Sequence, residues 1–274
     1  MNPVSFRTAA LLVLFLLPVV FLTACGEAVQ EPPVSDTVPV ISEPVTASPV
    51  ETETEAVYHP APIDELISEE TEALPPKVYT FTDAPEDYFS DALFIGDSRT
   101  VGLSDYSPLP GADYFSNIGM SVYTVMSAKV PVGDLGSVTL EELLSSRTYG
   151  KIYLMLGINE LGYGRNATVG RYGELVSFLR ERQPDALLFL EANLHVTATR
   201  SAEDEIINNP EINDFNARIS AFADSTDIFY IDINEAFDDA YGNLRTDYTF
   251  DDAHLLAEHY ETWNNWLKTK AILK

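Results

Sequence analysis

Four short apolar runs stand out between residues 93 and 231, separated by longer segments with a different pattern. Uninterrupted runs of this length are typical of strands buried on both faces of a parallel sheet. They predict strands at 93–95, 152–156, 186–190 and 228–231. A less apolar segment at 113–118, which ends just before Gly119, is interpreted as a further strand.

Between these strands, apolar residues recur at spacings of three and four, which is typical of a helix with one buried face. Residues 140–145 are interpreted as the end of one helix, and Pro184 marks the end of the following helix, which contains Tyr172. Three helices are predicted from the stripes Tyr172, Leu175, Val176 and Leu179; Ile212, Phe215, Ile219 and Phe222; and Leu256, Tyr260, Trp263 and Leu267. The alternation of strand and helix predicts an α/β fold with helices on both sides of a parallel sheet.

The front of the chain differs from this pattern. Residues 9–22 are apolar but are interrupted by Pro18, and they fall short of the about 20 residues that a membrane-spanning helix needs. A secretory signal fits this segment better. The run ends in Leu22-Thr23-Ala24-Cys25-Gly26, which resembles the lipobox of bacterial lipoproteins.

This resemblance implies a signal peptide at 1–24 and a lipid on Cys25 that holds the protein at the outer face of the bacterial cytoplasmic membrane. The alternatives are an uncleaved membrane anchor and an unmodified buried thiol. Residues 25–76 are rich in Pro, Glu, Thr, Ser and Val and have no Lys or Arg, so we expect a disordered tether. The domain is then expected at 77–274.

The chain carries a formal net charge of −27, and residues 77–274 hold 31 of its 43 acidic residues against 15 of its 16 basic ones. Nucleic acids need a basic face, so this balance excludes them as expected partners. The single cysteine allows no intrachain disulfide and no cysteine-based metal cluster. His59, His195 and His259 lack metal-ligand spacing, and we expect each to be exposed or satisfied in the core. No metal or organic cofactor is expected.

Ser98 occupies a position suited to chemistry. Gly96 permits a sharp turn after the first strand, so Ser98 begins a helix at the carboxyl edge of the sheet, where open α/β sheets bind ligands. Its backbone N–H then lies in the positive field of the helix start, which suits an oxyanion. The alternative is that Asp97 or Ser98 is an ordinary helix cap.

Three later positions could complete a serine hydrolase. Asp251 and His254 are three residues apart at the mouth of the last predicted helix, so their side chains can share one face. Asn159 and Gly119 follow predicted strands and could donate hydrogen bonds to an oxyanion at the same sheet edge. Taken singly, these residues have plainer interpretations: a capping Asp beside a surface His, a turn Asn and a Gly required sterically.

Together, these segments resemble the SGNH (GDSL-type) hydrolase superfamily from about residue 84 to the C-terminus. The resemblance implies a three-layer α/β/α sandwich on a five-stranded parallel sheet and serine esterase activity. It implies that Ser98 is the nucleophile, His254 the base and Asp251 its partner, with an oxyanion hole formed by Ser98, Gly119 and Asn159. The segments that carry it are Gly96-Asp97-Ser98, Gly119, Gly157-Ile158-Asn159-Glu160 and Asp251-Asp252-Ala253-His254.

Three positions depart from the commonest family pattern. Arg99 replaces a leucine and could place a cation near an anionic group of the substrate. Glu160 replaces an aspartate, which leaves the geometry of its loop open. Asp252 replaces a frequent glycine, so either Asp251 or Asp252 could orient His254.

The family's habits and the expected location favour O-acyl esters, especially O-acetyl groups on carbohydrate or cell-wall polymer, as substrates. A short-chain lipid ester or thioester remains open. Two further alternatives are an O-acyltransferase that uses the same residues on a sugar hydroxyl and a non-catalytic binding lipoprotein.

Overall fold

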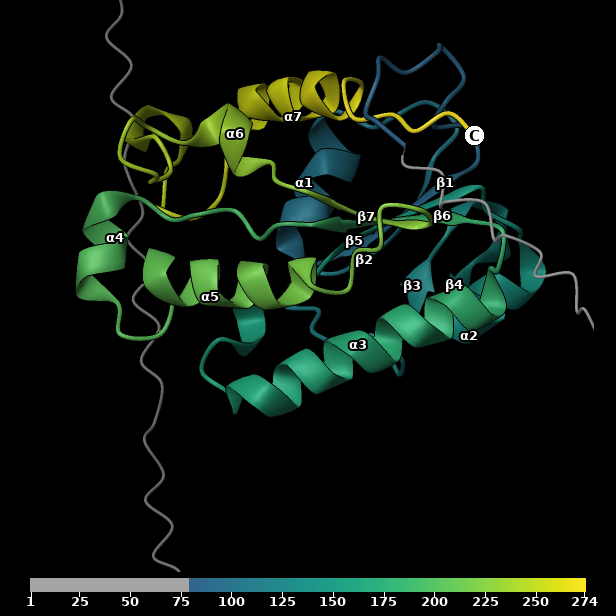
Figure 1. Ribbon diagram of the computed structural model, residues 1–274, viewed down its shortest axis with the longest axis horizontal. Coiled ribbons are helices and arrows are strands. Elements are labelled where there is room, and N and C mark those ends of the chain that lie inside the picture. The colour runs from purple at the N-terminus through teal and green to yellow at the C-terminus, as the bar shows by residue number, and fades with distance from the viewer. Residues whose placement is uncertain (1–78) are drawn as a thin grey trace, which may run out of the picture. The chain divides into compact units, whose positions relative to one another are not determined.

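The computed structural model describes residues 79–274, in which a five-stranded parallel sheet is covered by helices on both faces (Figure 1). The strand order is β2-β1-β5-β6-β7. Each of these five strands lies within two residues of a predicted one, and the three-layer α/β/α fold expected from the sequence is confirmed. The strands are β1 (Ala92–Gly96), β2 (Asp113–Ser116), β5 (Lys151–Met155), β6 (Leu187–Glu191) and β7 (Ile228–Ile231).

The continuous apolar runs are explained by burial on both sides of the sheet. Successive side chains of a strand point to opposite faces, so each face needs its own apolar set. On one face Leu93 and Ile95 pack with α2 (Leu140–Ser146), α3 (Arg165–Arg182) and α5 (Asn209–Ser220). On the other face Phe94 packs with α1 (Ser98–Tyr106), α6 (Asn234–Phe237) and α7 (Tyr260–Leu267).

The helices differ from the predicted stripes at their ends. Tyr172 and its companions are buried along α3 as expected, but Phe222 lies beyond the end of α5. The final helix starts only at Tyr260, after the 3-10 turn η4 (Ala257–His259), so Leu256 precedes it. Asp251 and His254 therefore do not lie on a helix.

Several short elements have no periodic signal and were not predicted. They are the antiparallel pair β3 (Val130–Pro131) and β4 (Ser137–Val138), the helices α4 (Ala198–Glu203) and α6, and the 3-10 turns η1 (Gly133–Leu135), η2 (Ile158–Glu160) and η3 (Thr246–Tyr248). The expected signal peptide at 1–24, Cys25 and the tether at 25–76 lie outside the described residues. No helix within 79–274 has the length and apolar character needed to cross a membrane.

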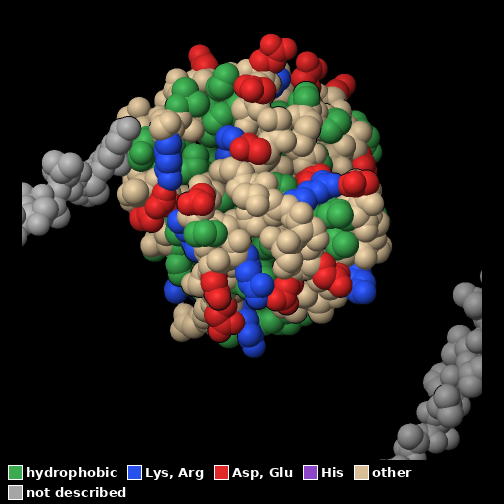
Figure 2. Space-filling model, turned by 90° about the vertical axis from the view of Figure 1, so that its right-hand side faces the viewer, with side chains coloured by type: hydrophobic (Ala, Val, Ile, Leu, Met, Phe, Trp, Pro, Cys, Tyr) green, Lys and Arg blue, Asp and Glu red, His purple; other side chains and the backbone are tan. Residues whose placement is uncertain are grey.

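Acidic and basic side chains are interspersed on the face at the right-hand side of Figure 1, and no large area of one charge is visible there (Figure 2). Several ion pairs involve residues at the amino ends of strands, including Lys151 with Asp91 and Arg147 with Asp113. These pairs lie at the surface with partly buried side chains, and surface pairs contribute little stability, about 0–1 kcal/mol each.

Candidate active site

Ser98 is the first residue of α1 and follows β1 directly. Asp97 caps the helix, because its carboxylate accepts a hydrogen bond from the backbone N–H of Arg99 at 3.0 Å. Gly96 is needed at this turn: a Cβ there would lie 1.9 Å from Oγ1 of Thr100 and 2.9 Å from the carbonyl oxygen of Met155. The turn therefore presents Ser98, half-buried, at the carboxyl edge of the sheet.

Arg99 does not line the groove around Ser98, so it does not place a cation near an anionic group of the substrate, as the sequence had left open. Its side chain is 2% exposed and forms an ion pair with Asp97. It also donates to Oδ1 of Asn193 at 2.8 Å. A buried guanidinium must be paired, and this one holds the cap beside Ser98 instead of facing a ligand.

Ser98, His254 and Asp251 form a continuous chain of contacts. Oγ of Ser98 lies 2.9 Å from Nε2 of His254, and Nδ1 of the same ring lies 2.7 Å from Oδ2 of Asp251. The other oxygen of Asp251 accepts the backbone N–H groups of Ala253 and His254. The two side chains meet through this tight turn and not through the helical spacing on which the sequence argument relied.

Asp251 is held in its charged form. Burial alone would raise the pKa of this carboxyl, but hydrogen bonds from the backbone and ring of His254 and from the backbone of Ala253 outweigh it and lower the pKa. An ionised Asp251 accepts a hydrogen bond from Nδ1–H of His254, which leaves Nε2 free to accept the Ser98 proton.

Asp252 faces another partner. Its Oδ1 accepts a hydrogen bond from the Thr197 hydroxyl at 2.7 Å, and its carbonyl oxygen accepts one from the Thr197 N–H at 3.0 Å. Its φ of 68° is in the left-handed region, which non-glycine residues rarely adopt. Of the two candidates, Asp251 is the aspartate that contacts His254.

Gly119 and Asn159 lie at the same sheet edge as Ser98. Gly119 has a φ of 75° in the turn after β2, and the N–H of Asn117 ties this turn to the carbonyl oxygen of Gly96 at 3.2 Å. Asn159 follows β5 in η2, and its side-chain amide donates to the carbonyl oxygen of Met120 at 3.0 Å. The Asn159 amide therefore contacts the turn that carries Gly119.

Glu160 also holds this turn, which the sequence argument left open. Its side chain is buried, and Oε1 accepts the N–H of Val122. Burial is the main cause that raises the pKa of Glu160 to about 7. Asn159 and Glu160 thus brace the turn after β2 from adjacent positions.

A groove of about 570 Å³ opens beside Ser98 and His254. Its most exposed apolar side chains are Ile118, Phe250 and Tyr106, which are 76%, 72% and 60% exposed. The lining includes Asp105 but no lysine or arginine. The groove therefore suits uncharged ligand surfaces and offers no cation to an anionic one.

The remaining described histidines lie away from this groove. His195 is buried between Asp238 and Asn213, and the ring of His259 stacks on Tyr248 at 3.8 Å. His59 lies outside the described residues. Within 79–274, no group of three or more His, Cys, Asp or Glu side chains is arranged to hold a metal ion.

The model of the GDSL-like lipase/acylhydrolase family matches residues 94–262, which is more than half of the chain. The chain belongs to this family. The matched range includes Ser98, Gly119, Asn159, Asp251 and His254, and membership makes the protein a serine esterase.

Solved structures of other bacterial proteins have a fold similar to that of this GDSL family member. A Streptococcus pneumonia protein provisionally described as a platelet activating factor shares 20% identity with a TM-score of 0.51, covering 65% of this chain and 82% of that one. A GDSL-like lipase from Bacteroides thetaiotaomicron shares 16% identity with a TM-score of 0.50, covering 65% and 86%. These similarities show a shared fold. A comparison with curated proteins gives no match.

Proposed function

We propose that this protein hydrolyses O-acyl esters with Ser98 as nucleophile, His254 as general base and Asp251 as the group that orients the imidazole. The observation that carries this proposal is the unbroken path from Oγ of Ser98 through His254 to Asp251, with contacts of 2.9 and 2.7 Å. A serine hydroxyl needs a base to accept its proton, and a base held by a carboxylate keeps the required tautomer.

The reaction proceeds in two halves. Oγ of Ser98 attacks the ester carbonyl while its proton passes to Nε2 of His254, and the same proton then leaves with the alcohol. The resulting acyl-serine is attacked by a water molecule whose proton again goes to Nε2. Collapse of the second tetrahedral intermediate returns that proton to Ser98 and releases the acid.

The oxyanion is assigned to three N–H donors. The backbone N–H of Ser98 has no acceptor within α1, because the first N–H groups of a helix point out of it. Gly119 supplies a second backbone N–H, and the Asn159 amide keeps one hydrogen beyond the one given to Met120. Loss of one such donor costs about 3–4 kcal/mol of transition-state stabilisation.

The proposed substrates are uncharged esters, with O-acetyl groups on carbohydrate or cell-wall polymer as the first class. The groove supports this choice because its exposed side chains Phe250, Tyr106 and Ile118 offer apolar surfaces and its lining contains no cation. Aromatic side chains are well suited to pack on uncharged ring systems while leaving polar groups in water.

The decisive experiment compares acetate release by the wild type and by Ser98→Ala from p-nitrophenyl acetate and from a panel of acetylated polysaccharides and peptidoglycan. We expect turnover with the wild type and none with the variant, whose circular dichroism spectrum stays unchanged. Wild-type rates in Ser98→Ala would remove Ser98 as nucleophile. A sugar acceptor added to the same assay distinguishes the alternative, since an O-acyltransferase would form an acylated sugar in place of free acetate.

We propose that Cys25 carries a lipid that holds the enzyme at the outer face of the cytoplasmic membrane. The support is the Leu22-Thr23-Ala24-Cys25-Gly26 pattern at the end of the apolar run. Cys25→Ser should abolish lipid labelling and leave a precursor or a released protein. Unchanged labelling of that variant would overturn the assignment.

A further inference from the structure

The segment 192–197 is buried along its whole length, although it belongs to no helix or strand. It continues from β6, whose register with β7 ends where Glu191 lies opposite Ile231. Buried backbone N–H and C=O groups need hydrogen-bond partners, and beyond this point neighbouring strands no longer supply them in full.

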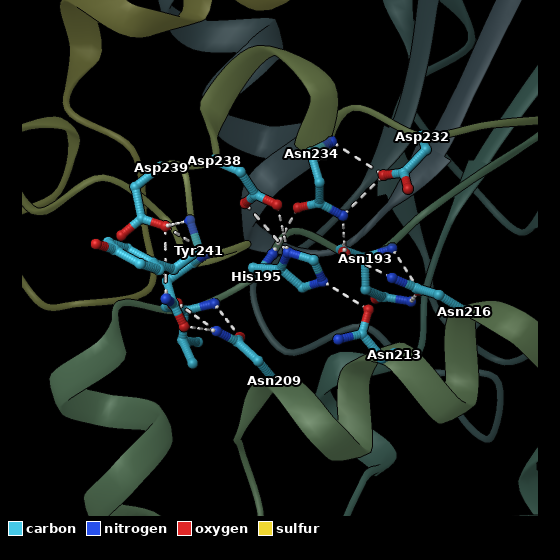
Figure 3. Close-up of polar contacts among 12 residues, drawn as sticks. Asn193, His195, Asn209, Asn213, Asn216, Asp232, Asn234, Asp238, Asp239 and Tyr241 are labelled. Atoms are coloured by element: carbon cyan, nitrogen blue, oxygen red, sulfur yellow. Dashed lines mark hydrogen bonds and ion pairs between the residues drawn. The ribbon is translucent and has the colours of Figure 1, made fainter.

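Three buried asparagine side chains supply these partners (Figure 3). Asn216 accepts the N–H of Asn193 at 2.8 Å and donates to its carbonyl oxygen at 2.9 Å. Asn209 does the same for Val196, with distances of 2.8 and 2.9 Å. Asn234 accepts the N–H of His195 at 2.8 Å. A side-chain amide carries both a donor and an acceptor, so it can replace the peptide group of a missing strand.

We call residues 192–197, with the asparagine side chains that hold them, the braced segment. One end of the braced segment reaches the turns that carry Ser98 and Asn159. Oδ1 of Asn193 accepts two hydrogen bonds, one from Nη2 of Arg99 at 2.8 Å and one from the backbone N–H of Ile158 at 3.1 Å. The Asn193 amide also donates to the carbonyl oxygen of Leu156 at 3.1 Å. A single side chain therefore connects the cap beside Ser98 with the start of η2.

The other end reaches the loop that carries His254. A bridge between Thr249 and Leu255 closes this loop, and Asp251 fills it with internal hydrogen bonds. Within residues 79–274, three hydrogen bonds connect residues 250–254 of this loop to other parts of the structure. Two join Thr197 to Asp252, and the third joins Ser98 to His254.

We propose that the braced segment is a strut that sets the position of His254 against Ser98, with Thr197 as its positioning residue. This rests on the proposed function, because His254 must be the base for its position to affect the rate. Thr197 also offsets the cost of the left-handed conformation of Asp252, where φ is 68°. The hydroxyl of Thr197 and the carboxylate of Asp252 act as one unit that fixes the tip of the loop.

The test is a double-mutant cycle on p-nitrophenyl acetate hydrolysis with Thr197→Val and Asp252→Gly. Valine keeps the shape of threonine without its hydroxyl, and glycine removes the carboxylate without adding backbone strain. A displacement of 1 Å costs up to about 100-fold in rate, so we expect each variant to lower kcat by about tenfold with little change in KM. The kcat of the double variant should be no lower than that of either single variant, because both substitutions remove the same hydrogen bond between the Thr197 hydroxyl and the Asp252 carboxylate.

Two controls separate positioning from stability. Thr197→Ser keeps the hydroxyl and should restore kcat to within about twofold of the wild type. Thr197 also caps α4 by accepting the N–H of Arg200, and Asp252→Gly leaves that cap intact, so Asp252→Gly decides the matter if Thr197→Val fails to fold.

Additive losses, an unchanged kcat in Asp252→Gly, or a loss in Thr197→Ser equal to that in Thr197→Val would overturn the strut. Ser98→Ala, measured in parallel, separates the two proposals. If that variant is inactive while the cycle shows no effect, only the strut fails; if it stays active, the proposed function fails.

Discussion

Within residues 79–274, two histidine–aspartate pairs have nearly the same geometry in very different surroundings. Nδ1 of His254 lies 2.7 Å from Asp251, and Nδ1 of His195 lies 2.9 Å from Asp238. The side chain of His254 is 40% exposed and that of His195 is 8% exposed. The two pairs differ in what the second ring nitrogen meets.

Nε2 of His254 faces a serine hydroxyl beside an open groove, whereas Nε2 of His195 faces Oδ1 of Asn213 in the interior. A carboxylate can orient either ring, but only the first has a nucleophile and a path for substrate. The comparison teaches that a histidine–aspartate pair becomes reactive through its third neighbour and its access.

The largest expected effect comes from exchanging each histidine for glutamine. His254→Gln should lower kcat on p-nitrophenyl acetate by about 10⁶-fold, because Ser98 then has no base. His195→Gln should leave kcat within a few-fold and instead lower the free energy of unfolding by about 1–3 kcal/mol. Steady-state kinetics and urea unfolding measure the two effects, and a catalytic loss in His195→Gln as large as in His254→Gln would erase the distinction.

The next largest expected effect on kcat comes from replacing each of the two neighbouring aspartates by asparagine. Asp251→Asn removes the carboxylate that orients His254, and we expect a loss of about 10⁴-fold in kcat. Asp252→Asn is the matched control, because asparagine still accepts the Thr197 hydroxyl and tolerates the left-handed region. The reverse order of the two kcat values would show that the observed contact with Asp251 does not carry the chemistry.

Glu160→Gln tests the brace beside Asn159 through pH. The folded pKa of about 7 lies above the ordinary 4.5, so the folded protein binds the proton more tightly and loses stability as the pH rises from 4.5 to 7. The variant should lack this loss and exceed the wild type at pH 8 by on the order of 1–3 kcal/mol. Urea unfolding at pH 5 and 8 measures it, and an equal pH dependence in both proteins would contradict the assignment.

The smallest effect is the pH dependence of the buried His195 pair. Burial lowers the pKa of His195, but the hydrogen bond and charge of Asp238 outweigh it, and the pKa is raised above 6.5. The pair therefore contributes its full stability below pH 6.5 and loses it as the pH rises through the raised pKa. His195→Gln should remove this decline between pH 6 and 8. A decline that persists in the variant would place the titrating group elsewhere.

Much of the fold was predictable because burial on both faces leaves a local signature. The strands at β1, β5, β6 and β7 appear as uninterrupted apolar runs, and the stripe that begins at Tyr172 marks α3. The positions of Ser98 and Asn159 followed from the rule that strand ends in a parallel sheet share one edge. The predicted start of the last helix was wrong because the apolar spacing continues through the turn before Tyr260, where α7 begins.

The sequence by itself determined the α/β alternation, the family and the candidate residues, because these depend on periodicity and short spacings. Tertiary structure decided that Arg99 is buried with Asp97, that Asp251 contacts His254, and that scattered asparagines brace one segment. These outcomes depend on which side chains lie close together after the chain has folded. Residues far apart in the chain have no periodic signal that records such contacts, so only the packed molecule reveals them.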